Sequence, residues 1–265
     1  MEAVSEGGRA TLYGRHPVLE LLRGGARRIE ELAVLREGRG PALQEIVNLA
    51  ASRGVRVSFR TRDQLTASAG SPHHQGVVAR VAEAGYATLD ELLAIPAQRG
   101  EPAFFLALDQ VQDPGNLGAL LRTAEAVGVH GVVIPKHRAA GLTGGTAKAA
   151  MGAIEFVRVA RETNLVAALE EFKKHGVWVV GSVPRGGARI WEADLRGPIC
   201  LVLGGEGAGL RPLVARSCDL LVTLPMRGRV GSLNVAAAGA VVCYEVLRQR
   251  TAPEEKTVDF EDSRK

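Results

Sequence analysis

The sequence has few cysteines and no long apolar run, and each absence excludes a class of protein. Its 265 residues contain no stretch of about 18 uncharged apolar residues, which excludes a membrane-spanning helix. The first eight residues are acidic and lack an apolar core, so we expect no signal peptide. Cys200, Cys218 and Cys243 form no CxxC pair and fit no zinc spacing. We therefore expect buried, reduced thiols in a cytoplasmic protein.

Lysine is also absent before Lys136, so the cations of the first half of the chain are arginines and histidines. The net charge of +4 is a weak indication of a polyanionic partner. Arginine suits bidentate phosphate contact, although a GC-rich genome would produce the same bias. The length and the 46% hydrophobic content predict one large globular domain or two modest ones.

The first 83 residues predict a small α/β module. Residues 1–10 are polar and glycine-rich, typical of a flexible arm. Residues 11–83 then alternate helical and strand patterns. The predicted helices are 16–23, 41–53 and 62–69, and the predicted strands are 29–35, 55–59 and 76–81.

Residues 84–101 predict a linker with a short helix over 88–95, capped by Thr88 with Glu91 three residues on. Residues 102–250 alternate strands and helices, which predicts a mostly parallel sheet covered on both faces. The charged segment 251–265 lacks periodicity and is expected to be disordered. The expected strands are 103–108, 131–134, 155–159, 177–181, 199–203 and 219–223, and the expected helices are 116–127, 164–175, 210–216 and 232–249.

Three loops follow predicted strands, at the sheet edge where α/β proteins bind ligands. The first, 109–118, contains a Pro-Gly turn, and Asn116 is placed to cap the next helix. After its first residue, that helix carries only two charged side chains, Arg122 and Glu125, among mostly alanine, leucine and valine. Arg122 is therefore a candidate functional residue, and a solvated or salt-bridged face with Glu125 is the alternative.

The second loop, 204–210, is glycine-rich and lets a ligand approach the backbone closely. It matches neither the dinucleotide fingerprint nor the Walker A motif. Its carboxylate, Glu206, is either a ligand contact or a brace for backbone amides. A tight turn without a ligand is the alternative for the whole loop.

The third loop, 224–234, precedes a helix of small residues that indicates close packing against another helix or subunit. Ser232 is placed as the N-cap of this helix. Arg227 and Arg229 add positive charge, for phosphate contact or simple solvation. Elsewhere, GxSxG is absent, and His73 with His74 lacks a third metal ligand, so we expect no metal site.

Together the three loops resemble the motifs of the SpoU (TrmH-like) family of RNA ribose 2′-O-methyltransferases. The resemblance covers about residues 104–250. The first motif is 116–124, the second 203–210 and the third 231–235, in the family's order. The front module, through 13–18 and 74–79, is similar to the RNA-binding domain of the ribosomal-RNA branch, which resembles ribosomal protein L30e.

The resemblance implies an L30e-like front domain and a SPOUT-type catalytic domain with a C-terminal trefoil knot. It also implies a homodimer and S-adenosylmethionine as cofactor. The residues expected to hold the cofactor are Gly204, Gly205, Leu224, Pro225, Met226, Ser232 and Leu233. Those expected to contact RNA are Arg15, His16, His74, Gln75, Arg227 and Arg229.

The implied reaction is displacement at a sulfonium methyl by a ribose 2′-oxygen. Arginine keeps its proton in proteins, so we expect Arg122 to orient the hydroxyl and stabilise developing charge rather than act as a base. Asn116 would position Arg122 or the ribose, and Glu206 would hold the glycine loop. Ser232 and Asn234 would hold the third loop, although each polar residue could be only a cap or brace.

The function that the resemblance implies is methylation of a guanosine ribose in 23S ribosomal RNA. The same chemistry on transfer RNA and a non-catalytic RNA-binding protein are the alternatives. A nucleotide-dependent oxidoreductase is disfavoured, because no dinucleotide fingerprint is present.

Overall fold

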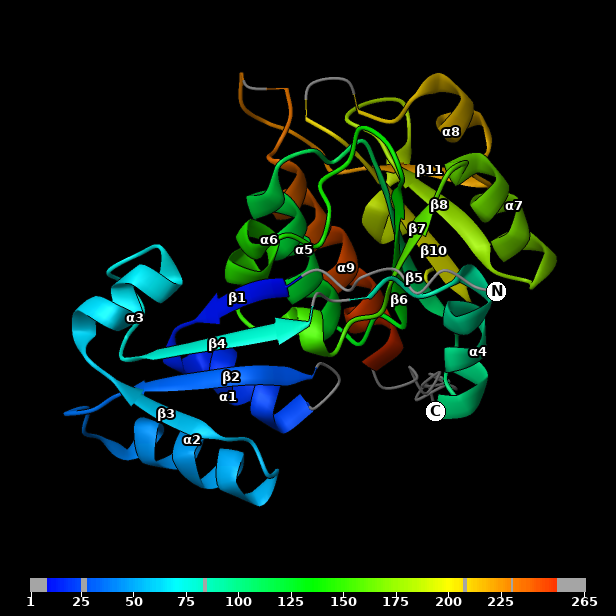
Figure 1. The fold of residues 1–265 in the computed structure, drawn as a ribbon. Coiled ribbons are helices and arrows are strands. Elements are labelled where there is room, and N and C mark those ends of the chain that lie inside the picture. The colour runs from blue at the N-terminus through cyan, green and yellow to red at the C-terminus, as the bar shows by residue number, and fades with distance from the viewer. Residues whose placement is uncertain (1–8, 25–27, 83–84, 207–208, 230, 252–265) are drawn as a thin grey trace, which may run out of the picture.

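The computed structural model describes residues 9–24, 28–82, 85–206, 209–229 and 231–251. They form a four-stranded sheet in the first third of the chain and a seven-stranded sheet in the rest (Figure 1). Residues 1–8 of the arm expected over 1–10 and residues 252–265 of the tail expected over 251–265 lie outside these residues, and Thr251 belongs to the last helix rather than to the tail. Within the described ranges, no helix has both the length and the apolar character needed to cross a membrane.

The smaller sheet has the strand order β1-β4-β2-β3 and forms the front module. β4 pairs antiparallel with β1 and β2, and β2 pairs parallel with β3. The elements are β1 (Arg9–Tyr13), α1 (Arg15–Gly24), β2 (Ile29–Leu35), α2 (Pro41–Ser52), β3 (Val57–Arg60), α3 (Arg62–Ala69) and β4 (Val77–Ala82).

Alternation along the strands divides the core of the front module between two faces. Leu32 and Val34 of β2 pack in the cluster that contains α1 and α2. Ala33 and Val78 pack against Leu65 of α3 on the other face. The predicted bounds of β2 and α3 are confirmed, but β1 was not predicted. Residues 9 and 10 belong to this strand rather than to an arm, because β1 is defined by pairing with the distant β4.

The larger sheet has the order β7-β6-β5-β10-β8-β11-β9, and all its described strand pairs are parallel, as predicted. Its elements are α4 (Leu89–Arg99), β5 (Phe104–Asp109), α5 (Pro114–Ala126), β6 (Gly131–Pro135), α6 (Gly144–Ala149), β7 (Val159–Glu162), α7 (Leu165–Lys174), β8 (Trp178–Ser182), β9 (Ala188–Arg189), β10 (Ile199–Gly204), α8 (Pro212–Arg216), β11 (Leu220–Thr223) and α9 (Val235–Thr251), with 3-10 turns η1 (Ala153–Glu155) and η2 (Ile190–Glu192).

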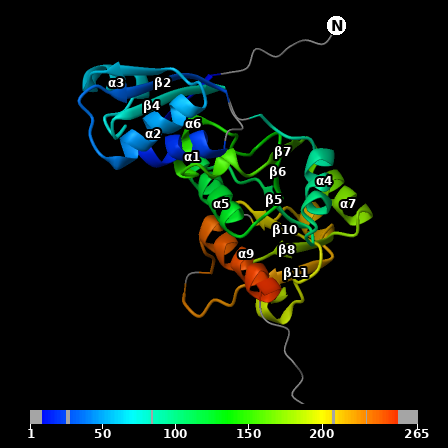
Figure 2. The same ribbon diagram turned by 90° about the horizontal axis from the view of Figure 1, so that it is seen from below.

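Helices cover both faces of this sheet (Figure 2). On one face, Phe105 of β5 packs in a cluster with residues of α4, α7 and α8. On the other, Phe104 and Leu106 of the same strand pack in a cluster with residues of α5, α6 and α9. The continuous apolar run of β5 follows from this double burial.

In this half, two local predictions were wrong and one helix, α6, was not predicted. The strand expected over 155–159 lies at 159–162, because residues 153–155 form the turn η1, which contacts α1. α4 continues through the buried Pro96 to Arg99 and ends at Gly100, whose φ is 66°. α6 lacks an apolar periodicity, and its N-cap Thr143 is its main sequence signal.

The front module and the larger sheet share one continuous hydrophobic cluster. α1 contacts η1, and β1 contacts α6. The Lys148 ammonium of α6 lies 5.6 Å from the ring centroid of Tyr13 in β1. The trefoil knot implied by the resemblance stays a prediction.

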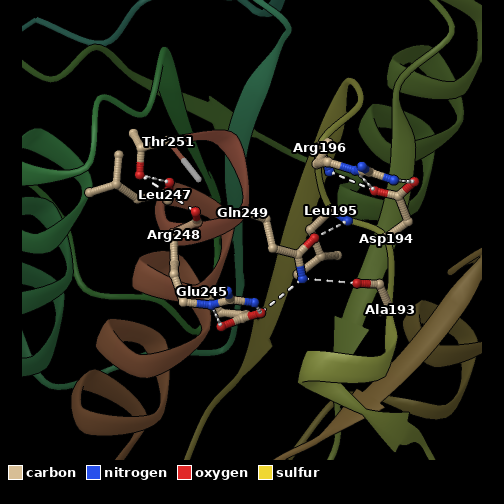
Figure 3. Close-up of polar contacts among 9 residues, drawn as sticks. All are labelled: Ala193, Asp194, Leu195, Arg196, Glu245, Leu247, Arg248, Gln249 and Thr251. Atoms are coloured by element: carbon tan, nitrogen blue, oxygen red, sulfur yellow. Dashed lines mark hydrogen bonds and ion pairs between the residues drawn. The ribbon is translucent and has the colours of Figure 1, made fainter. Parts of the chain in front are cut away.

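The C-terminal end of α9 is tied to the loop before β10 (Figure 3). Gln249 Nε2 donates to the Ala193 carbonyl at 3.0 Å, and Gln249 Oε1 accepts from the Leu195 amide at 2.8 Å. Arg250 donates to the carbonyls of Pro102, Ala103 and Gly197. These bonds hold the C-terminal end of α9 at one edge of the sheet. The first residue of α9 lies at the opposite edge.

All three cysteines are free, and Cys200 and Cys243 are buried. Burial raises the pKa of Cys218 to about 11 and that of Cys243 to about 12. Both are therefore thiols at neutral pH, as the sequence predicts.

Candidate active site

A pocket of about 400 Å³ opens at the carboxyl edge of the larger sheet. This edge is where an open α/β sheet binds ligands, and the strand order reverses between β5 and β10. We call it the loop pocket. It is formed by the segments that follow β8, β10 and β11 and by the start of α9. Its lining comprises Ser182, Val183, Pro184, Leu203, Gly204, Gly205, Glu206, Gly209, Leu224, Met226, Gly231, Ser232, Leu233, Asn234, Val235 and Ala238.

The glycine loop after β10 folds so tightly that side chains are excluded at two positions. A Cβ on Gly204 would lie 2.1 Å from the carbonyl carbon of Gly209, and one on Gly205 would lie 2.2 Å from the carbonyl oxygen of Gln110. The Gly205 amide donates to the Asp109 carbonyl at 2.7 Å. Close packing against the end of β5 thus explains these glycines.

A buried carboxylate also ties the glycine loop to β5. Asp109 is fully buried, and its oxygens accept from the Arg211 backbone amide at 2.9 Å and from Arg211 Nε at 2.8 Å. A second guanidinium nitrogen lies 2.7 Å away. No local pattern in the sequence relates these two residues, because they are 102 residues apart.

Three polar side chains from the three loops meet at the mouth of the pocket. Asn116 Nδ2 donates to Glu206 Oε1. Asn234 Nδ2 donates to Asn116 Oδ1 and to Glu206 Oε1, each at 3.0 Å. We call Asn116, Glu206 and Asn234 the amide–carboxylate cluster. These three residues come from the three sequence motifs and are far apart in the sequence, but they are neighbours in the structure.

Two of the three predicted helix caps, those at Asn116 and Ser232, were placed on the wrong residue. Asp113 caps α5 by accepting from the Asn116 amide at 2.7 Å, so Asn116 lies inside the first turn. Asn234 Oδ1 accepts from the amides of Ala236 at 2.9 Å and Ala237 at 3.3 Å at the start of α9. Ser232 lies two residues before this cap and lines the loop pocket.

Most residues expected to hold the cofactor line the loop pocket. These are Gly204, Gly205, Leu224, Met226, Ser232 and Leu233. Pro225 is exposed and is not among the lining residues that the structure describes. The segment 182–184 also lines the pocket and was missed. Its position directly after a predicted strand was the available signal.

The arginines expected to act on RNA are exposed. Arg122 lies on α5, and its guanidinium has no hydrogen bond or ion pair with Glu125 or with any other residue that the structure describes. Arg227 and Arg229 lie exposed in the loop after β11. Each guanidinium therefore remains available for a ligand.

In the front module, the four expected RNA contacts differ in exposure. His16 and Gln75 are exposed, and Arg15 Nε donates to the Gln75 carbonyl at 3.1 Å. His74 is buried, and its Nδ1 accepts from the Gly76 amide at 3.0 Å. Burial, with the charge of Arg62 nearby, lowers the pKa of His74. Its ring thus supports the turn before β4, contrary to the surface contact expected.

No group of three histidine, cysteine, aspartate or glutamate side chains is arranged to hold a metal ion in the part of the chain that the structure describes. The loop pocket instead combines apolar side chains, such as Leu224 and Leu233, with glycine backbone and a few polar groups. That composition is typical of sites for organic ligands.

Comparison with known proteins agrees with this geometry. The model of the SpoU rRNA Methylase family matches residues 103–244, and the model for RNA 2′-O ribose methyltransferase substrate binding matches residues 11–87. This chain belongs to the SpoU rRNA methylase family. The predicted family and its α/β fold are thereby confirmed.

Individual members of the family are similar over almost the whole chain. The 23S rRNA (guanosine-2′-O-)-methyltransferase RlmB of Coxiella burnetii is 42% identical, covering 92% of this chain and 97% of that protein. RlmB of Ralstonia nicotianae is also 42% identical, covering 91% and 96%. The crystal structure of the SpoU methyltransferase AviRb from Streptomyces viridochromogenes, in complex with AdoMet, matches with a TM-score of 0.76 at 26% identity, covering 92% of this chain and 91% of AviRb.

Proposed function

We propose that this chain transfers a methyl group from S-adenosylmethionine to the 2′-hydroxyl of a guanosine ribose in 23S ribosomal RNA. The observation that carries the proposal is the loop pocket with the amide–carboxylate cluster at its mouth, at the carboxyl edge of a parallel sheet. The two RlmB relatives support the substrate, since both align over more than 90% of this chain.

The loop pocket fits the proposed cofactor in size and chemistry. Its volume lies within the usual range for small-molecule sites. Leu224, Met226 and Leu233 offer apolar surface for a base, and the glycine backbone offers polar groups at close approach. When bound there, S-adenosylmethionine supplies an electrophilic methyl group on a sulfonium.

The remaining demands of the reaction fall on this chain's own side chains. We assign to Arg122 the orientation of the ribose hydroxyl and the stabilisation of its developing negative charge, because a guanidinium has donors but no site to accept a proton. Asn116 and Asn234 hold Glu206 in place and so join the three loops around the reacting groups. The Ser232 hydroxyl is placed to contact the cofactor.

We also propose that the chain forms a homodimer through α5 and α9. Ala237, Val241 and Tyr244 lie on one stripe of α9, and the last two are about half exposed. α9 packs against α5, which carries the exposed Arg122. An exposed apolar stripe of this kind is typical of a protein interface.

The front module favours ribosomal RNA over transfer RNA as the substrate. It is matched by a substrate-binding model, and the RlmB relatives align across it. Exposed arginines at both ends of the molecule predict RNA affinity that falls steeply with salt concentration. Acting on ribosomal RNA, the enzyme would work in the cytoplasm.

The decisive test is transfer of a labelled methyl group to unmodified 23S ribosomal RNA and to transfer RNA, followed by alkaline digestion. Label in one alkali-resistant dinucleotide of the ribosomal RNA is expected. Label in transfer RNA alone would refute the proposed substrate. Absence of label in both RNAs, together with no binding of S-adenosylhomocysteine, would refute the proposed methyltransferase activity. Arg122→Ala should reduce turnover and leave S-adenosylhomocysteine affinity unchanged.

A further inference from the structure

The front module contains a second pocket, at the edge strand β3 and far from the loop pocket. Its volume is about 580 Å³. Val34, Leu35, Leu43 and Val47 form its apolar base, and Phe59 forms one wall. We call it the Phe59 pocket. The loop 36–40 at its rim lies at the end of the front module farthest from the larger sheet (Figure 1).

The Phe59 ring lies beside this pocket, and its flat apolar face is exposed to water. Its side chain is 53% exposed, although it pairs in register with the buried Val34 of β2. Edge strands usually carry polar or charged residues on exposed positions. An aromatic ring beside a cavity of this size provides a surface on which a planar group can stack.

The rim of the Phe59 pocket is positively charged. Arg39 lines the pocket, and Arg36 lies exposed three residues earlier. Neither guanidinium has an ion pair or hydrogen bond with the residues that the structure describes. A terminal nitrogen of Arg15 lies 3.9 Å from the Cβ position of Gly40. The exposed Glu37 is the one carboxylate within the loop 36–40, so the rim carries a net positive charge.

One amide side chain that can meet the edge of a base is also present. Gln44 lines the pocket from the first turns of α2. The N-cap Gly40 offers no side chain to the helix, and Pro41 occupies the first turn. An aromatic wall, an amide and unpaired arginines are the groups with which proteins bind unstacked bases and their phosphates.

We propose that the Phe59 pocket binds one unstacked nucleotide of the substrate RNA, with the base stacked on Phe59 and the adjacent phosphates held by Arg39 and Arg15. This inference rests on the proposed RNA substrate and adds a contact remote from the methylated ribose. The substrate must therefore extend well beyond the target nucleotide, and the pocket contributes to RNA affinity without contributing to the chemical step.

The test measures RNA binding apart from catalysis. The full-length protein, saturated with S-adenosylhomocysteine, is titrated into a fluorescent transcript of the 23S RNA region that the wild type methylates, or into full 23S RNA if no methylation occurs. Phe59→Ala is expected to raise Kd by about 5- to 150-fold, the range for loss of one stacked base. Phe59→Trp should retain wild-type affinity. Trp191→Ala is the control, since Trp191 is 52% exposed in the other half of the chain.

Methyl-transfer kinetics and a charge variant complete the design. Phe59→Ala should raise KM for RNA in proportion to Kd and leave kcat and S-adenosylhomocysteine affinity unchanged. Arg39→Gln should reduce the slope of log Kd against log salt by about 0.7, as for one phosphate contact on a single strand.

Three results would overturn the proposal. One is RNA affinity of Phe59→Ala within twofold of the wild type. Another is equal loss in Phe59→Ala and Phe59→Trp, which would indicate a packing role. The third is that Phe59→Ala binds the naked transcript as the wild type does but binds an assembling large subunit more weakly, which would indicate a protein partner for the pocket. Phe59-dependent RNA binding without methyl transfer by the wild type would support the pocket and refute the proposed function.

Discussion

Asn234 performs two tasks that a single substitution can separate. Its Oδ1 caps α9, and its Nδ2 donates to Asn116 and Glu206. Asn234→Asp keeps the capping oxygen and replaces the donor with a second carboxylate oxygen facing Glu206. We expect α9 to retain its cap, since aspartate is as good an N-cap as asparagine. The amide–carboxylate cluster, in contrast, should separate.

The size of this effect follows from the geometry of the cluster. Two unit charges 3.0 Å apart repel by about 1.4 kcal/mol in water and by about 5.5 kcal/mol at an effective dielectric constant of about 20. Both side chains are exposed, so solvent screening reduces the repulsion to about 1 to 3 kcal/mol. Because both residues line the loop pocket, S-adenosylhomocysteine affinity should fall by about 5- to 150-fold.

Isothermal titration calorimetry with S-adenosylhomocysteine from pH 8 to pH 5 measures this effect. The defect of Asn234→Asp should shrink toward pH 5, where two adjacent carboxylates can share a proton, and should shrink in high salt. Asn234→Ala loses both the cap and the cluster bonds, so its defect should not depend on pH. Wild-type affinity of Asn234→Asp at pH 8 and low salt would refute the reasoning, as would a defect independent of pH.

Three further substitutions test other parts of the structure. Gly204→Ala places a Cβ 2.1 Å from backbone and should abolish S-adenosylhomocysteine binding in a thermal-shift assay, whereas Gly228→Ala, in open space, should not. Asp109→Asn removes the charge that pairs with Arg211 and should destabilise the fold by about 1 to 3 kcal/mol in urea unfolding. Burial lowers the pKa of His130, so its contribution to stability is present above pH 6.5 and is lost as the pH falls through the lowered pKa. His130→Asn should flatten the decline of unfolding free energy below pH 6.5.

The parts of the fold that the sequence predicted carry strong local signals. β5 is a continuous apolar run, and α4 begins with the capping box of Thr88 and Glu91. The parts that were missed depend on distant partners. β1 is defined by its pairing with β4, and β9 is a two-residue strand that exists through its pairing with β11. No local pattern specifies either of them.

The same distinction applies to the site. The order of the three loops was visible in the sequence, because each follows an apolar strand. Their convergence depends on the strand order, which places β10 between β5 and β8, with β11 on the other side of β8. The ion pair of Asp109 with Arg211 and the exposure of Phe59 could be recognised only in the tertiary structure. The sequence around each of these residues carries no signal for them.

The two misplaced helix caps also show how the site obtains its polar groups. A residue that caps a helix uses its side-chain oxygen on backbone amides. Because Asp113 caps α5, the side chain of Asn116 is left to bond Glu206 and Asn234. Because Asn234 caps α9, Ser232, which lines the loop pocket, has no capping role. Each cap lies two or three residues from the predicted position, so one polar side chain at each helix remains available to the site. A capping rule applied to single residues assigns those side chains to the helix instead.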